Sequence, residues 1–136
     1  MLSQMYTSGQ GLPDSKPNLK LAFELTIKAA SEGEKVAQHN AGQLYLGQYE
    51  KDPKSNKDSI LFGIEFYKMA AEQGFIPSNV ALGMIYEKGI GLVKPNSILA
   101  QFYYQSAVSL YPASDRKGDD YSYFTDAQQG LLRLSS

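Results

Sequence analysis

The sequence predicts an all-α chain, a right-handed superhelical α/α solenoid of helix-turn-helix repeats. Three observations predict it: two sets of landmarks recur at nearly equal spacing, each set has helical periodicity, and glycines stand where helices should end. The chain has 136 residues, of which 43% are hydrophobic and 20% charged, which is typical of one folded domain. A repeat of this length is characteristic of stacked helical units.

The first landmark is a small residue followed by glycine, an aliphatic residue and tyrosine. It occurs as NAGQLY, ending at Tyr45, as ALGMIY, ending at Tyr86, and more loosely as MLSQMY, ending at Tyr6. The tyrosines are separated by 39 residues (6 to 45) and 41 residues (45 to 86). This spacing defines one period of the repeat.

The second landmark combines an aromatic or aliphatic start with a pair of alanines and a glycine. It occurs as LTIKAASEG at residues 25–33, as FYKMAAEQG at 66–74 and, degraded, as YYQSAVSLY at 103–111. The copies start 41 residues (25 to 66) and 37 residues (66 to 103) apart. Two independent landmarks with nearly the same period argue against chance.

The second landmark lies on an amphipathic helix. Its apolar positions follow i, i+3, i+7 and i+8, which places them on one buried face. Pro17 or Asn18 supplies a start signal, and Gly33 and Gly74 can adopt the left-handed conformation that ends a helix. The apolar positions are Ala22, Leu25, Ala29 and Ala30 in one copy and Gly63, Phe66, Ala70 and Ala71 in the next.

These signals predict long helices near residues 18–32 and 58–73, and the first landmark predicts shorter partner helices near 35–47 and 77–88. A glycine-rich turn joins the two helices of a unit, at residues 9–12 in one copy and 89–92 in another. One helical pair cannot bury its apolar face alone, so neighbouring units are expected to stack.

With these motifs in place, the sequence resembles the Sel1-like repeat, a relative of the tetratricopeptide repeat. The best copy takes its first half from residues 81–92 and its second half from 63–74. The resemblance covers nearly the whole chain and implies a single domain, 1–136, with three repeats and a final helix. The expected repeats span approximately 1–33, 35–74 and 77–111, and the helix spans 125–134.

The repeat pattern is interrupted twice. The middle turn carries a polar insertion, YEKDPKSNK, at residues 49–57, and residues 112–123 are predicted to form a long loop. The chain also starts inside a predicted helix, which leaves Leu2 and Met5 without an upstream neighbour. We therefore expect a portion of a longer solenoid that self-associates through this edge; a natural terminus with one frayed helix is the alternative.

Composition narrows the classes of partner. Thirteen basic and fourteen acidic side chains give a net charge of −1, which offers no field for nucleic acid or an anionic membrane. No apolar stretch approaches the ~20 residues of a membrane-spanning helix, and the first residues lack the pattern of a signal peptide. We expect a soluble protein of undetermined compartment that binds another protein or a peptide.

The sequence offers little for catalysis. There is no cysteine, and the one histidine, His39, is expected on the surface or in a groove, without an acidic residue at i+3 or i+4 that would complete a metal site. The Gly-x-Gly turns lack the lysine of a phosphate loop, and the mixed charges of residues 115–120 are expected to form a solvated loop. We predict no enzymatic activity, no cofactor and no metal.

A protein-interaction module, an adaptor or scaffold that binds a partner on its concave face, is therefore the leading prediction. The alternatives are a neutralising, immunity-type partner of an enzyme or toxin and, less favoured, a hydrolase. The segments 49–57 and 112–123 could carry the contacts in place of the groove. The predicted binding residues lie on the first helix of each unit, outside the packing positions: His39, Gln43, Leu46, Asn79, Met84 and Glu87.

Overall fold

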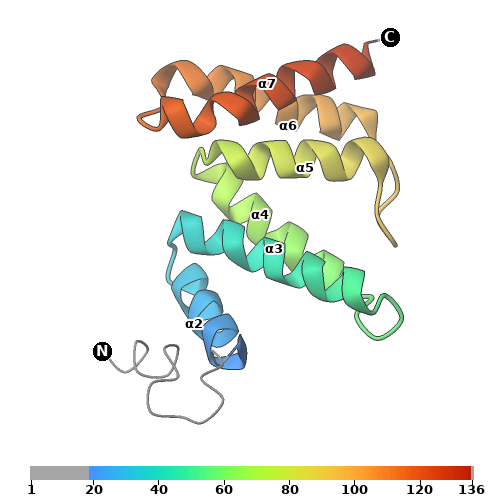
Figure 1. The fold of residues 1–136 in the computed structure, drawn as a ribbon. Coiled ribbons are helices and arrows are strands. Elements are labelled where there is room, and N and C mark those ends of the chain that lie inside the picture. The colour runs from blue at the N-terminus through green and yellow to red at the C-terminus, as the bar shows by residue number, and fades with distance from the viewer. Residues whose placement is uncertain (1–18, 136) are drawn as a thin grey trace.

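A computed structural model describes residues 19–135 (Figure 1). Most of these residues lie in helices, and an isolated β-bridge pairs Ile90 with Val93 in one of the connections. The elements are α2 (Leu19–Ser31), α3 (Lys35–Lys51), α4 (Ser59–Glu72), α5 (Ile76–Lys88), α6 (Ser97–Leu110), the 3₁₀ turn η1 (Tyr111–Ala113) and α7 (Lys117–Leu134).

Consecutive helices pack as antiparallel pairs. The most extensive contacts join α3 to α4 and α5 to α6, and α7 packs against both α5 and α6. In Figure 1, α5, α6 and α7 pack against one another at the top of the view, and α3 and α4 lie below them, inclined to α5. The architecture is an α/α solenoid, which confirms the predicted fold class.

The glycines predicted to end helices do so. Gly33 and Gly74 have φ angles of +102° and +80°, a region that side chains with a Cβ rarely adopt. The Gly74 N–H donates to the Ala71 carbonyl (2.9 Å) and the Phe75 N–H to the Ala70 carbonyl (3.2 Å), which is the Schellman pattern. The last carbonyls of α4 are thereby satisfied, and the chain reverses into α5.

The glycine-rich turn at residues 89–92 is also present. Gly89 and Gly91 have φ angles of +75° and +55°, and the backbones of Ile90 and Val93 exchange two hydrogen bonds of 2.9 Å. The matching turn predicted at residues 9–12 lies outside the described residues, as do Leu2, Met5 and Tyr6.

Each helical pair is held by a glycine that faces a tyrosine ring. A methyl group at Gly42 of α3 would lie 2.8 Å from the ring of Tyr67 on α4, and one at Gly83 of α5 would lie 2.7 Å from the ring of Tyr104 on α6. Only glycine permits this approach of helix and ring. The core around these pairs consists of Ile60, Ile64, Tyr67, Ile76, Val80, Leu82, Ile85, Tyr86, Ala100, Tyr104, Ala107 and Ala127.

The apolar positions of the second landmark are buried to different extents. Ala30 and Ala70 are fully buried, as predicted, and Ala71 is half-buried against the core. Leu25, predicted to be buried, is 37% exposed. Among the described helices α2 packs chiefly against α3, so part of its apolar face has no neighbour.

Helix α3 extends beyond its predicted end at residue 47 and continues to Lys51, into the polar insertion. The N–H of Asp52 donates to the Gln48 carbonyl (3.2 Å), and the Asn56 side chain donates to the same carbonyl (3.0 Å). Tyr49, counted with the insertion, packs against the core. These contacts supply the hydrogen bonds and burial that the extra helical turn needs.

The predicted loop at residues 112–123 and the helix at 125–134 need correction, because α7 begins at Lys117. Asp119 and Asp120 occupy its first turn, where carboxylates interact favourably with the helix dipole. The Phe124 ring stacks on Tyr111 with centroids 4.4 Å apart. A segment with mixed charges thus forms a helix because its acids stand at the helix start and its aromatic residues find a partner.

Candidate functional site

The sequence predicted His39 on the surface or in a groove, and this is wrong. Only 8% of the residue is exposed. Its Nδ1 lies 2.8 Å from the Ser78 Oγ of α5, and its ring contacts Tyr67 and Phe75 at centroid distances of 5.1 and 5.4 Å. Burial, aided by the charge of Arg116, lowers its pKa from 6.5 to about 4. His39 is a neutral packing residue that joins α3 to α5.

Glu87 is also engaged inside the fold rather than available to a partner. The Tyr104 hydroxyl donates to Glu87 Oε1 (2.7 Å), and the Arg133 guanidinium donates to both carboxylate oxygens (2.8 and 2.9 Å). These hydrogen bonds, that from Arg133 foremost, lower the pKa of Glu87 from 4.5 to about 2. The carboxylate joins α5 to α6 and α7.

The remaining predicted residues fall into different environments. Gln43 is exposed, Met84 is 41% exposed, and Leu46 is half-buried against the core. Asn79 is only 3% exposed. The premise that all six residues are free of packing is therefore wrong for three of them, because His39 and Asn79 are buried and Glu87 is bonded to Tyr104 and Arg133. A binding role for Gln43, Leu46 and Met84 stays a prediction.

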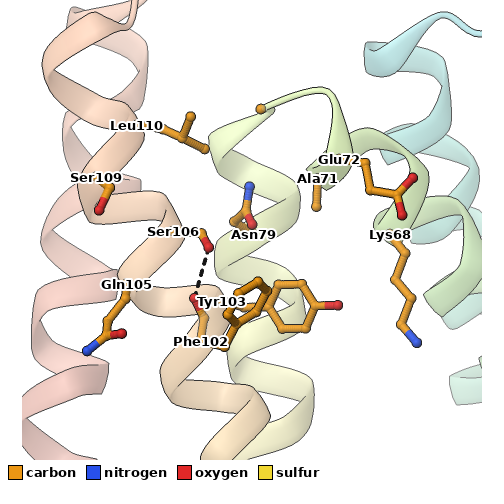
Figure 2. Close-up of a pocket in the computed structure, with 11 residues that line it drawn as sticks. Lys68, Ala71, Glu72, Asn79, Phe102, Tyr103, Gln105, Ser106, Ser109 and Leu110 are labelled. Atoms are coloured by element: carbon orange, nitrogen blue, oxygen red, sulfur yellow. Dashed lines mark hydrogen bonds between the residues drawn. The ribbon is translucent and has the colours of Figure 1, made fainter.

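A pocket lies between α4 and α6, over the start of α5 (Figure 2). Its volume is about 650 Å³. We call it the α4–α6 groove. Its lining comes from the second helices of two successive units, together with Asn79: Lys68, Ala71, Glu72, Gly74, Asn79, Phe102, Tyr103, Gln105, Ser106, Ser109 and Leu110.

Aromatic rings form one side of this groove. Tyr103 stacks on Tyr86 of α5 with centroids 5.9 Å apart and planes at 9°, which fixes its orientation. Phe102 meets Tyr103 edge to face at 5.1 Å and is 58% exposed. A large exposed ring beside an anchored one provides apolar surface for a ligand.

Asn79 gives the groove a polar group beneath its apolar wall. Its Nδ2 donates to the Phe75 carbonyl (3.1 Å), and no donor among residues 19–135 reaches its Oδ1. This oxygen is not among the fully buried atoms left without a hydrogen-bond partner, which among the described residues are Arg116 Nη1 and Asp120 Oδ1, so a donor from a ligand can reach it. Asn79 is the one residue among the six predicted that lines the groove.

Charged residues of both signs stand on the α4 side of the groove, Lys68 and Glu72 (Figure 2). Burial lowers the pKa of Lys68, but the nearby hydroxyls of Tyr86 and Tyr103 and the carboxylate of Glu65 raise it by more. The net pKa is raised, and the ammonium is charged at neutral pH.

The groove residues on α4 and α6 were missed by the sequence reasoning, which placed the site on the first helices. One signal was available. Ile98 and Phe102 stand at i and i+4 on α6, and they are 78% and 58% exposed. Two large apolar residues on a helix face that the repeat pattern does not use for packing are a candidate for a contact surface.

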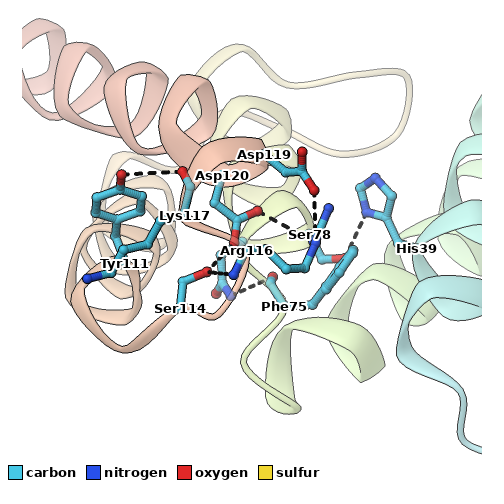
Figure 3. Close-up of polar contacts among 10 residues, drawn as sticks. His39, Phe75, Ser78, Tyr111, Ser114, Arg116, Lys117, Asp119 and Asp120 are labelled. Atoms are coloured by element: carbon cyan, nitrogen blue, oxygen red, sulfur yellow. Dashed lines mark hydrogen bonds and ion pairs between the residues drawn. The ribbon is translucent and has the colours of Figure 1, made fainter.

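A second polar cluster surrounds the start of α7 (Figure 3). The Arg116 guanidinium lies over the Phe75 ring (5.1 Å) and 3.4 Å from Asp120, which is 3% exposed. Ser114 Oγ donates to Asp120 (2.6 Å) and accepts the Arg116 N–H (3.0 Å). The expected solvated loop is thus wrong for these residues, because they fasten α7 to the joint between α4 and α5.

The contact between His39 and Ser78 superficially resembles a base beside a nucleophile. Ser78 is fully buried, His39 is 8% exposed, and neither residue lines the α4–α6 groove. A histidine with a pKa of about 4 is also a weak base at neutral pH. The arrangement fits packing of two units better than chemistry.

Two further features of the described residues bear on function. No group of three or more His, Cys, Asp or Glu side chains is placed to hold a metal ion. No helix between residues 19 and 135 is long and apolar enough to span a membrane.

The comparisons with known proteins agree with this geometry. The family model described as "Sel1 repeat" matches residues 1–34, 35–75 and 76–111. Among solved structures, the crystal structure of a Sel1 repeat protein from Oxalobacter formigenes is similar, with a TM-score of 0.57 and 30% sequence identity, over 79% of this chain and 76% of that one. The search of curated proteins found no match.

Sel1 repeats generally mediate interactions between proteins. Since three repeat matches cover most of the sequence and the helices stack as an α/α solenoid, the chain belongs to the Sel1 repeat family.

Proposed function

We propose that this chain is a non-catalytic protein-interaction module that binds a short segment of a partner protein in the α4–α6 groove. The observation that carries the proposal is the pairing of exposed Phe102 with buried Asn79, whose Oδ1 has no donor among the described residues. A peptide segment supplies the two complementary features, an apolar side chain and a backbone N–H.

The apolar part of the groove suits one or two side chains of such a segment. Phe102 and Tyr103 lie on the α6 side, Ala71 faces them from α4, and Leu110 lies toward the end of the groove (Figure 2). Aromatic side chains at the centre of an interface commonly contribute much of the binding energy. Phe102 is the most exposed residue of this set, so a ligand can bury more of its surface than of any other.

The polar part of the groove gives direction to a bound segment. Asn79 Oδ1 can accept a backbone N–H, and Gln105 and Ser109 offer further polar groups on α6. Lys68 and Glu72 carry opposite charges, so the groove does not select a segment of one sign. We expect recognition by shape and hydrogen bonds, with a modest dependence on salt.

A selection from a displayed library of random peptides tests the proposal. Enriched peptides are titrated by calorimetry against Phe102→Glu and, as a matched control, Phe62→Glu, which changes an equally aromatic, 54% exposed position on α4 outside the groove lining. We expect Phe102→Glu to weaken binding by about tenfold or more and Phe62→Glu to leave it unchanged.

Variants of the first helices test the competing surface. Gln43→Glu and Met84→Glu change exposed residues that the sequence predicted to bind. Loss of affinity in these two with full affinity in Phe102→Glu would move the site to the first helices. Failure of the library to yield any peptide that Phe102→Glu weakens would refute the groove.

A further inference from the structure

A second surface is formed by the two connections inside the helical pairs. The loop 52–58 joins α3 to α4, and the turn 89–96 joins α5 to α6. Because the units stack in the same orientation, both connections lie at the same end of the solenoid, on the right of Figure 1. We call this end the basic rim.

The turn 89–96 packs on the ends of α3 and α4 that flank the loop 52–58. A methyl group at Gly91 would lie 2.5 Å from Ile60 Cδ1 and 3.0 Å from the Tyr49 hydroxyl. Gly91 also has a φ of +55°, so both space and backbone conformation favour glycine at this position. The turn of one unit is thereby seated on the helices of the preceding unit.

A cavity of about 290 Å³ opens where the connections meet. Tyr49, Pro53 and Leu92 give it an apolar lining, and Gly91 lies at its edge without a side chain. Leu92 is 63% exposed, although it is a large aliphatic residue on a turn. The cavity has the size and chemistry for one apolar side chain of a ligand.

Lysines surround this cavity. Lys54 and Lys57 line it directly. Every lysine of this end is exposed, and none has a carboxylate within 4.0 Å among residues 19–135: Lys51, Lys54, Lys57, Lys88 and Lys94. The nearby acids are fewer, namely Glu50, Asp52, Asp58 and Glu87, and Glu87 is already paired with Arg133.

The opposite end of the solenoid has the reverse balance. Its connections lie between α2 and α3, α4 and α5, and α6 and α7, and Arg116 there is already paired with Asp119 and Asp120. Acids outnumber bases at that end by six to four: Glu32, Glu34, Glu72, Asp115, Asp119 and Asp120 against Lys28, Lys35, Arg116 and Lys117. The net charge of −1 is therefore the sum of an excess of bases at the basic rim and an excess of acids at the opposite end.

We propose that the basic rim is a second binding site, which takes an acidic segment of a partner protein with one apolar side chain. The apolar side chain enters the cavity beside Leu92, and the flanking carboxylates face Lys54 and Lys57. Charge complementarity selects the acidic segment, and the cavity selects a protein segment over other polyanions. This site is separate from the α4–α6 groove and does not depend on it.

The test uses labelled peptides of the form EDEXEDE, with X varied through the amino acids, and fluorescence anisotropy on the full chain. We expect leucine, methionine or phenylalanine at X to bind about tenfold more tightly than glycine or serine. Lys54→Glu with Lys57→Glu should weaken binding of the best peptide by about tenfold or more. The matched control, Lys20→Glu with Lys28→Glu, makes the same charge change on exposed lysines of α2 and should have little effect.

Two further variants separate the contributions. Leu92→Ser should abolish the preference for an apolar X while leaving the affinity of the glycine peptide unchanged. Phe102→Glu should bind the acidic peptides like the native chain, so this proposal and that of the groove can fail separately.

Several results would overturn the inference. These are absence of binding by every peptide, affinity independent of X, or equal losses in the rim and α2 double variants. Binding of polyuridylate or of phosphatidylserine vesicles with the same dependence on Lys54 and Lys57 would also do so, because it would show a general attraction for polyanions.

Discussion

The pairs α3–α4 and α5–α6 solve the same packing problem with different connections. In each, a glycine faces a tyrosine ring, Gly42 with Tyr67 and Gly83 with Tyr104. In each, a second pair of rings stacks almost in parallel, Tyr45 on Phe66 at 8° and Tyr86 on Tyr103 at 9°. Their connections differ, since one is the polar loop 52–58 and the other is the turn 89–96, which contains Gly89 and Gly91. The glycine-tyrosine contact therefore sets the register, and the connection is free to vary.

The pairs also differ in how firmly their tyrosine is held. The Tyr104 ring lies between Gly83 of α5 and Gly130 of α7, and its hydroxyl donates to Glu87. Gly130 and Arg133 of α7 are spaced like Gly83 and Tyr86 of α5, so α7 packs as a further first helix would. The C-terminal pair is enclosed on both sides, and we expect it to be the more stable part.

Removing the Tyr104 ring should lower the free energy of unfolding more than any other change proposed here. Tyr104→Ala empties a fully buried site between three helices, and large-to-small substitutions of aromatic core residues typically cost ~3–5 kcal/mol. Tyr67→Ala should cost less, because the Tyr67 ring faces one glycine, Gly42, where Tyr104 faces two, and its hydroxyl lacks a carboxylate partner. Urea denaturation of both variants measures the difference; equal losses would show that α7 adds nothing.

Adding a methyl group at Gly83 should have the second-largest effect on stability. Gly83→Ala places a methyl group 2.7 Å from a ring that Gly130 prevents from moving away, and such overpacking typically costs ~1–3 kcal/mol. The control is Gly47→Ala on α3, where nothing lies within 4 Å and alanine should stabilise the helix by ~0.5–1 kcal/mol. Thermal melts that change in the same direction for both variants would refute the proposed register.

Glu87 should make the stability of the α5–α6 pair depend on pH in the acid range. Its folded-state pKa of about 2 lies below its ordinary value of 4.5, so its contribution is complete above pH 4.5 and is lost as pH falls toward 2. Glu87→Gln should lose ~1–2 kcal/mol at neutral pH and lack this acid-dependent loss. Denaturation between pH 7 and pH 2 tests this, and an unchanged profile in the variant would assign the acid loss to other groups.

His39, which joins α3 to α5, should make stability depend on pH over a higher range than Glu87 does. Its folded-state pKa of about 4 lies below 6.5, so the unfolded chain takes up the proton first and stability falls as pH drops from 6.5 toward 4. His39→Gln should remove that slope while leaving the lower window of Glu87. Titration of the ring by NMR checks the assignment directly, and a pKa near 6.5 in the folded chain would contradict the burial of His39.

The sequence predicted those parts of the fold that depend on local chemistry. The caps at Gly33 and Gly74, the turn at Gly89 and the packing of Ala30 and Ala70 follow from backbone freedom or small size, which residue type alone reveals. The start of α7 could not be predicted from residue type. It depends on contacts of Asp120 with Ser114 and Arg116 and of Phe124 with Tyr111, which form only in the folded chain.

The candidate site was harder to predict for the same reason. His39 and Glu87 are polar residues outside the repeat motif, which the sequence reasoning equated with exposure. Their partners, Ser78 and Arg133, lie 39 and 46 residues away along the chain, and no local pattern signals such contacts. The groove likewise arises where second helices of successive units face each other, a relation that exists only after stacking.

The proposed groove is tested most directly by NMR mapping of the tightest library-selected peptide on the isotope-labelled chain. The account predicts that amide shifts on binding concentrate on α4 and α6 around Lys68, Phe102 and Ser106, with the Asn79 side-chain amide among them. It predicts much smaller changes at Gln43 and Met84. Shifts centred on Gln43 and Met84, with the resonances of α6 unmoved, would contradict the account and place the binding site on the first helices.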